Sequence, residues 1–236
     1  MICIIEIMGR NAGWLAGAAA LASASGEGPD LVYLPEIDFD VDKFVADVKK
    51  IYEEKGKVII AASEGIHDKD GKFISEYGSA NAAKDASGHT QLGGLASFLA
   101  NHLKAATGAK VRGIELSLLQ RCGAHLASQT DIDESFAAGK TAVEAAVAGE
   151  TDKMVGFECS RENGAYICKT KLFNLSDVAN FEKKVPREWI NEAGNYVNQQ
   201  FIDYALPLIQ GDNHRATENG LPRFAHLKKV LASEKA

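Results

Sequence analysis

The 236-residue chain has little cysteine, no long hydrophobic run and no excess of positive charge. Its four cysteines show no Cys-x-x-Cys spacing, which argues against a zinc knuckle and against a disulfide framework. No run of about 18 apolar residues occurs, and the short apolar start has neither a basic flank nor a cleavage site. We therefore expect a cytoplasmic protein with reduced thiols, neither secreted nor spanning a membrane.

The charge balance narrows the class of partner. The 26 lysines and arginines are outnumbered by 32 acidic residues, which gives a net charge of −6. A general electrostatic affinity for nucleic acid or for an anionic membrane is therefore not expected. The 46% hydrophobic and 25% charged residues are typical of a globular protein, long enough for one large domain or two small ones.

Strand and helix patterns alternate through the first half of the sequence. Apolar runs predict strands over residues 2–7, 31–34, 57–62 and 110–119, and apolar periodicity predicts helices over 14–24, 41–54 and 90–106. Asp40 is the expected N-cap of the second helix. This order requires right-handed crossovers, so we predict an α/β fold with a doubly wound, mostly parallel sheet and helices on both faces.

Two features of this half carry further expectations. Residues 66–88 are polar and glycine-rich and contain Asp70-Gly71, a hairpin signal, which predicts a two-stranded flap or lid. The nearly unbroken apolar strand at residues 2–7 belongs in a sheet interior, where chains seldom begin. We therefore expect residues upstream of it to be missing.

The second half has a different pattern. It predicts a helix over 131–147, capped within Thr130–Asp133, and then strands over 153–160 and 165–173 joined by Glu162-Asn163-Gly164. A cap at Ser176 or Asp177 predicts a short helix, residues 186–205 are expected to be largely helical, and a loop-rich tail follows.

Candidate site residues lie where the predicted strands end. Ligands of open parallel sheets bind outside the carboxyl ends of the strands. These positions hold Met8-Gly9-Arg10, Glu36 and Glu64-Gly65, and the fourth strand adds Arg112 near its start and Gln120-Arg121 beyond its end. Guanidinium groups clamp phosphate and a carboxylate accepts bonds from sugar hydroxyls, so the pattern predicts a sugar phosphate ligand.

Each of these residues also has a structural interpretation. Gly9-x-x-x-Gly13 does not match the dinucleotide pattern Gly-x-Gly-x-x-Gly and fits a tight strand-to-helix turn. The three arginines fit ordinary surface positions, Glu64 fits a cap, and the six histidines show no ligand spacing. Neither a Ser-His-Asp or Cys-His set nor a cluster of transition-metal ligands is present in the pattern.

Three segments together resemble a known family. The segment from Glu6 to Ala16 resembles the Met-Gly-Arg segment of the phosphofructokinases. Ser63-Glu64-Gly65 is similar to the family's Glu-Gly, and the stretch from Arg112 to Arg121 is similar to its closing substrate motif. Residues 2 to about 205 follow the family's element order, and three motifs in order are far more specific than any one alone.

The resemblance implies roles for these residues. Met8, Gly9 and Arg10 would line a fructose 6-phosphate site, Glu64 would accept sugar hydroxyls, and Arg121, next to Gln120, would hold the 6-phosphate. Arg112 matches an arginine that reaches a neighbouring subunit's site, which implies a homodimer or tetramer. Arg10 is also a candidate catalytic residue. Leu118 stands where many members carry histidine, and Met1 stands where another subunit-bridging arginine is found.

The larger departure is an absence. The family's phosphoryl-donor half carries Gly-Gly-Asp and Thr-Ile-Asp-Asn-Asp segments with the general base and the magnesium-ligating acid, and neither occurs here. The resemblance thus implies the carboxyl-terminal portion of a phosphofructokinase. Residues 1–118 with 176–236 would form the sugar-phosphate-binding domain, and 119–175 a remnant of the donor domain. The Mg²⁺ ligands would lie in the absent half, and the chain alone would be inactive.

The phosphoryl donor is either pyrophosphate or ATP. Asn-Ala-Gly-Trp-Leu after Met-Gly-Arg, and Ile-Glu-Leu before Leu-Gln-Arg, resemble the pyrophosphate-dependent branch of this glycolytic family. The alternatives are an ATP-dependent enzyme and a non-catalytic sugar-phosphate-binding regulatory protein. A nucleotide-binding module is disfavoured, because neither a glycine fingerprint nor a ribose-binding acid is present.

Overall fold

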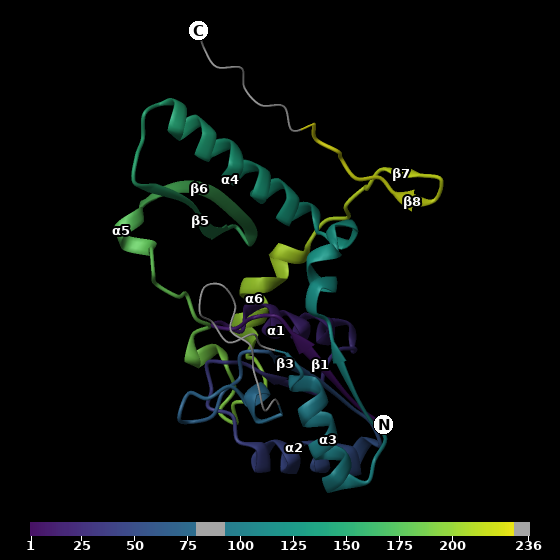
Figure 1. The fold of residues 1–236 in the computed structure, drawn as a ribbon. Coiled ribbons are helices and arrows are strands. Elements are labelled where there is room, and N and C mark those ends of the chain that lie inside the picture. Colours follow the sequence, from purple (N-terminus) through teal and green to yellow (C-terminus); the bar gives the residue numbers. More distant parts are fainter. Residues whose placement is uncertain (79–92, 229–236) are drawn as a thin grey trace.

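The computed structural model describes residues 1–78 and 93–228. Its centre is a parallel four-stranded sheet with the strand order β2-β3-β1-β4 (Figure 1). The strands are β1 (Ile2–Ile7), β2 (Leu31–Tyr33), β3 (Val58–Ser63) and β4 (Val111–Glu115). β1 lies between β3 and β4, as its apolar sequence predicts, and Ile2 and Ile4 are fully buried.

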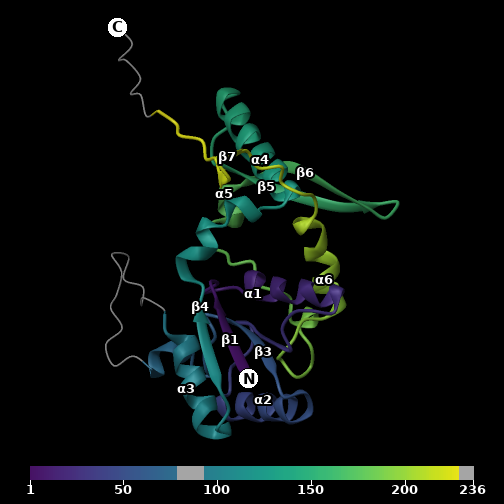
Figure 2. The same ribbon diagram turned by 90° about the vertical axis from the view of Figure 1, so that its right-hand side faces the viewer.

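Helices cover both faces of the sheet, which confirms the predicted α/β fold. On one face, α2 (Val41–Lys55) and α3 (Leu95–Thr107) bury their apolar sides against β1 and β3. On the other face, α1 (Trp14–Ala18), the 3-10 turns of Ala19–Ser25 and α6 (Gln199–Ala205) form a second core. Figure 2 shows α1 beside α6 and α2 beside α3. The chain therefore returns to the sheet domain after residue 175.

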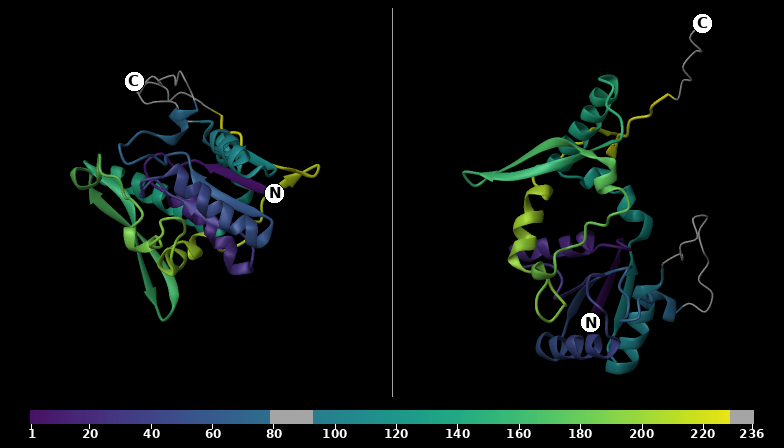
Figure 3. Two further views of the ribbon diagram at one scale, coloured as in Figure 1. Left: turned by 90° about the horizontal axis from the view of Figure 1, so that it is seen from below. Right: turned by 90° about the vertical axis from the view of Figure 1, so that its left-hand side faces the viewer.

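A second unit stands above the carboxyl edge of the sheet. Here α4 (Gln129–Val147) packs along a hairpin of β5 (Lys153–Glu162) and β6 (Ala165–Asn174), with α5 (Leu175–Val178) after it (Figure 3). Asn163 and Gly164 form the turn with φ of 52° and 81°, as the Asn-Gly pair predicts. The short strands β7 (Thr217–Glu218) and β8 (Leu221–Pro222) lie in the tail.

Several predicted boundaries were wrong because local hydrogen bonds decide them. The N-cap of α4 is Ser128 and not a residue of Thr130–Asp133, since its Oγ accepts the Asp131 N–H at 3.1 Å. Likewise α5 is preceded by Asn174 rather than by Ser176 or Asp177. β4 ends at Glu115, and Ser117–Cys122 forms 3-10 turns instead of further strand.

The largest error concerns residues 186–205, in which only Gln199–Ala205 forms an α-helix. A 3-10 turn covers Arg187–Trp189, and α6 starts only at Gln199. Between them, the Asn191 side-chain oxygen accepts the N–H groups of Asn195 at 2.9 Å and Tyr196 at 3.2 Å. An asparagine that satisfies backbone donors in this way favours a turn over a helix.

The predicted flap is only partly within the described residues. His67 and Phe73 form a single antiparallel bridge around a turn at Asp68–Gly71, and Ile74–Tyr77 is a 3-10 turn. The rest of the predicted flap, from residue 79, and the predicted start of the third helix at residue 90 lie outside the described residues. In the part of the chain that is described, no helix combines the length and apolarity that crossing a membrane requires.

Candidate functional site

The loops that follow β1 and β3 are hydrogen-bonded to each other. The Gly9 N–H donates to Glu64 Oε1 at 3.2 Å, and the Ser63 hydroxyl donates to the Gly9 carbonyl at 2.6 Å. The Glu64 N–H in turn donates to the Ile7 carbonyl at 2.9 Å. These bonds hold the Glu64 carboxylate at the turn that ends β1.

Two glycines make this close approach possible. Gly9 has φ of 147°, a backbone conformation that residues other than glycine rarely adopt. At Gly65, a Cβ atom would lie 1.9 Å from the Arg10 carbonyl oxygen. The backbone of Arg10 therefore lies directly against the loop after β3.

The loop after β4 joins the same cluster through Gln120. The Met8 N–H donates to Gln120 Oε1 at 2.7 Å, and the Leu116 N–H donates to the Glu6 carbonyl at 3.3 Å. Arg121, the next residue, is exposed in the 3-10 turns. The structure thus brings together Met8, Gly9, the Arg10 backbone, Glu64 and Gln120, with Arg121 adjacent to Gln120 in the chain.

Arg112 lies apart from this cluster. It stands in register with Cys3 near the start of β4, and it is exposed. Cys3 and Met8 are separated by ~16 Å of extended strand. Arg112 therefore lies at the opposite end of the sheet from Met8 and the other predicted site residues.

Glu36 holds two segments of the fold in place. Its Oε1 accepts the Gly13 N–H and the Val185 N–H, each at 2.9 Å. Its Oε2 is buried, and no partner for it is found among the described residues. Glu36 thus joins the start of α1 and the returning segment near Val185 to the end of β2, which is a structural role within the fold.

Glu6 was not predicted as a site residue. It is 3% exposed in β1, and its Oε2 accepts the Ala96 N–H at 2.9 Å, in the first turn of α3. Burial raises the pKa of the Glu6 carboxyl, the Ala96 bond opposes that shift, and the charges of Glu115 and Glu64 add to it. Glu6 is a charged residue within an otherwise apolar strand, and this sequence signal could have marked it as a candidate site residue.

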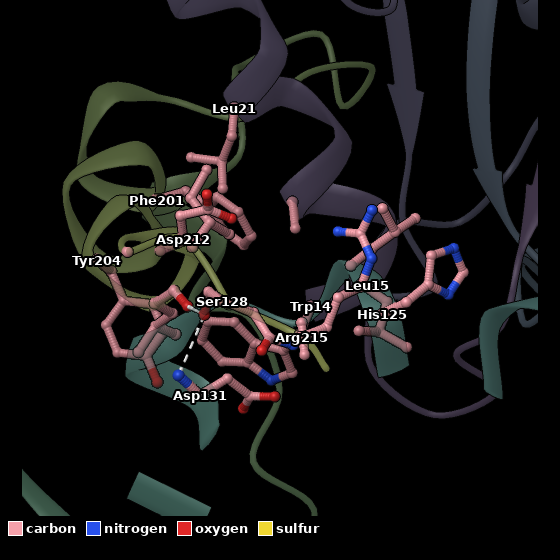
Figure 4. Close-up of a pocket in the computed structure, with 18 residues that line it drawn as sticks. Trp14, Leu15, Leu21, His125, Ser128, Asp131, Phe201, Tyr204, Asp212 and Arg215 are labelled. Atoms are coloured by element: carbon pink, nitrogen blue, oxygen red, sulfur yellow. Dashed lines mark hydrogen bonds between the residues drawn. The ribbon is translucent and has the colours of Figure 1, made fainter. Parts of the chain in front are cut away.

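A cavity of about 580 Å³ lies beyond the glycine turn, between the two units. Figure 4 shows aromatic side chains of α1 and α6 at this cavity, with Asp131 beside Ser128, and His125 near Arg215. None of the predicted substrate residues lines it. Trp14 is far in the sequence from Phe201 and Tyr204, so the sequence pattern gave no sign of this cavity.

The comparisons with known proteins identify the family. The family model described as Phosphofructokinase matches residues 1–146. This chain belongs to the phosphofructokinase family. A pyrophosphate--fructose 6-phosphate 1-phosphotransferase of Halomonas elongata is 41% identical over 99% of this chain and 55% of its own length. A protein of the same name from Xanthomonas campestris is 40% identical over 99% of this chain and 56% of its own.

A solved structure agrees with the sequence matches. The crystal structure of a pyrophosphate-dependent phosphofructokinase from Marinobacter aquaeolei superposes with a TM-score of 0.83 at 36% identity. It covers 100% of this chain and 54% of the other. The chain therefore spans about half the length of the phosphofructokinases it matches.

The resemblance to phosphofructokinases also implies Mg²⁺. Within the described ranges, no group of three or more histidine, cysteine, aspartate or glutamate side chains is placed to hold a metal ion. The described residues thus offer no such cluster for Mg²⁺, and we assign no step of the reaction to a metal bound by them.

Proposed function

We propose that this chain is the fructose-6-phosphate-binding part of a pyrophosphate-dependent phosphofructokinase. The reaction moves a phosphoryl group from pyrophosphate to the 1-hydroxyl of fructose 6-phosphate, a step of glycolysis. The observation that supports this most is the hydrogen-bonded set of three loops, with Met8, Glu64 and Gln120, at the carboxyl edge of the sheet. Relatives at 40–41% identity carry the name of that activity.

The proposed roles follow from the chemistry of each group. The guanidinium group of Arg121 would bind the 6-phosphate, since arginine matches phosphate oxygens in bidentate geometry, and Arg10 would line the sugar-phosphate site. Glu64 would accept hydrogen bonds from the sugar hydroxyls, and its bond to the Gly9 N–H would keep the carboxylate in place. Gln120 would position the Met8-Gly9-Arg10 turn rather than touch the phosphate.

The rest of the reaction needs groups beyond these residues. Phosphoryl transfer requires a bound donor, a metal to offset charge and an acceptor for the hydroxyl proton. We propose that the donor site, the base and the Mg²⁺ ligands belong to a part of the enzyme outside this chain, with residues 119–175 packing against it. Arg10 stays a candidate for stabilising the transferred phosphoryl group.

Arg112 supports an oligomeric enzyme in this proposal. Its exposed position, remote from Met8, suits an arginine that enters the site of a second subunit, so a homodimer or tetramer would complete each site. We propose a cytoplasmic location, because fructose 6-phosphate and reduced thiols belong there.

The test compares binding with turnover. Calorimetric titration should show that fructose 6-phosphate binds more tightly than fructose or inorganic phosphate, because only the sugar phosphate engages both the carboxylate and the arginines. With pyrophosphate and Mg²⁺ added, the purified chain should form no fructose 1,6-bisphosphate. Product formation by the chain alone would contradict the proposal that the donor site and the base lie outside it. Equal affinity for the three ligands would contradict the proposed sugar-phosphate site.

A further inference from the structure

Two cysteines face each other across the β5–β6 hairpin. Cys159 and Cys168 are direct partners in the antiparallel ladder, and both are free thiols. The Cys159 thiol donates to the Cys168 Sγ, and the two sulfur atoms are 3.6 Å apart. Cys159 and Cys168 are nine residues apart in the sequence, which is not a recognised spacing for a disulfide or a metal site. Only the register of the hairpin shows that they are neighbours.

The position of this pair in the ladder suits a disulfide bond. In a hairpin with a two-residue turn, the closing pair, here Glu162 and Ala165, exchanges both backbone hydrogen bonds, and the pairs then alternate. Cys159 and Cys168 form the fourth pair from the turn, which makes them a non-hydrogen-bonded pair. The Cα atoms of such pairs are ~4.5 Å apart, within the range that disulfides span.

The two thiols differ in access. Cys159 is exposed and lines a cavity of about 270 Å³ together with Arg161, Tyr166 and Tyr204. The Tyr166 hydroxyl lies 3.3 Å from the Cys159 sulfur, and the Arg161 guanidinium binds the Asp203 carbonyl of α6. Cys168 is half-buried, and burial raises the pKa of its thiol to about 12. An oxidant from solution therefore reaches Cys159 first.

We propose that Cys159 and Cys168 are a modification site that forms a reversible disulfide by exchange with a low-molecular-weight disulfide such as oxidised glutathione. The Cys159 thiolate attacks one sulfur of the reagent, and the reagent's sulfur–sulfur bond breaks to release one glutathione. Cys168 loses its proton and attacks the Cys159 sulfur, which forms the protein disulfide and releases the second glutathione. Two protein thiols are oxidised, one reagent disulfide is reduced, and the two protons end on the released thiols.

The bond would fix the hairpin without rearranging it. A disulfide across a non-hydrogen-bonded pair links β5 and β6 in the register they already have. Because Arg161 connects this hairpin to α6, the oxidised form also secures one contact between the two units. None of the proposed sugar-phosphate residues takes part, so the disulfide and the sugar-phosphate site are tested by separate measurements on this chain.

The experiment treats the full chain with oxidised glutathione, alkylates it with N-ethylmaleimide under denaturing conditions and measures its mass. The number of N-ethylmaleimide adducts should fall from four to two. Before alkylation, the mass of the oxidised chain should be lower by that of two hydrogen atoms. Trypsin cuts after Lys153, Arg161 and Lys169, so residues 154–161 and 162–169 should appear as a linked pair of peptides. Dithiothreitol should restore four adducts.

Matched variants decide the assignment. Cys122→Ser removes the other exposed cysteine and should still yield the linked peptides. Cys159→Ser and Cys168→Ser should each abolish the link. Four adducts after oxidation of the wild type, a link that involves Cys122, or a covalent dimer in place of the internal bond would each overturn the proposal.

Discussion

At the scale of single residues, the candidate site depends on contacts that the strand-end rule predicts only in outline. That rule placed Met8-Gly9-Arg10, Glu64 and Gln120 at one edge of the sheet, and the structure brings them together there. The individual hydrogen bonds were not predictable, because they depend on side-chain rotamers and on turns such as Ser117–Cys122. The same limit applies to Glu6, whose partner Ala96 lies ninety residues away.

Gly65→Ala tests the close contact between the first two loops. The new Cβ would meet the Arg10 carbonyl oxygen at 1.9 Å, so the Met8–Arg10 turn has to move. We expect a loss of ~1–3 kcal/mol in the free energy of unfolding and a roughly tenfold weaker binding of fructose 6-phosphate. Urea unfolding and calorimetry measure the two effects.

Gly139→Ala is the matched control for this substitution. It lies within α4, where a Cβ meets nothing within 4 Å, so it should stabilise the helix by ~0.5–1 kcal/mol and leave binding unchanged. If Gly65→Ala behaved like this control, the two loops would not be in the contact described.

Glu6→Gln tests the buried carboxyl. The folded-state pKa of Glu6 is raised above its unfolded value, so its contribution to stability is fully present below the unfolded pKa and is lost as pH rises through the folded one. The neutral glutamine keeps an acceptor for the Ala96 N–H and avoids that loss. We expect the variant to melt a few degrees above the wild type at pH 7, with the difference disappearing near pH 4.

The exposed Glu150→Gln is its control, because it makes the same charge change without burial. Its melting temperature should follow the wild type at both pH values. A Glu6→Gln variant that is less stable than the wild type at pH 7 would show that the charged form is favoured by the fold.

At the scale of elements, the sequence predicts best where burial and capping act together. The apolar runs of β1 and β3 and the periodic face of α2 all gave the observed elements, and Asp40 is the N-cap that was predicted. Prediction fails where a side chain competes for backbone donors, as Asn191 does in the stretch predicted to be helical before Gln199. Such competition depends on a tertiary context that a periodicity cannot encode.

Asp40→Ala tests the capping of α2. Its Oδ1 accepts the Lys43 N–H at 2.9 Å, so the substitution should cost ~1 kcal/mol of stability. Thermal unfolding followed by circular dichroism measures the loss. Asp38→Ala, an exposed residue just before the helix, should change stability far less, and equal losses for both variants would argue against a capping role.

At the scale of the whole molecule, the two units differ in how well their apolar groups are covered. The sheet domain has two well-buried cores, whereas α4 exposes a stripe of Ile132, Phe136, Val143 and Val147, with Phe136 at 73% and Val147 at 84%. Such a face is uncommon on a monomer and suits packing against further protein. The prediction that residues 119–175 belong with a donor domain would account for this face. The chain spans about half the length of the relatives that it matches.

The element order was enough to predict the sheet and its crossovers, because those rules are general for parallel sheets. The arrangement of the second unit was not predictable in the same way. No short-range pattern states that α4 packs on the β5–β6 hairpin or that a cavity forms near Trp14. Those features depend on contacts between distant segments.

Hydrogen exchange of the chain with and without fructose 6-phosphate tests whether the three loops form one binding site. In the proposed site, one ligand contacts the loops after β1, β3 and β4. We therefore expect slower exchange in peptides that cover residues 8–13, 63–66 and 117–122 together, and unchanged exchange in the β5–β6 hairpin. Protection of only one of these loops, or protection confined to the residues around Trp14 and Tyr204, would contradict it.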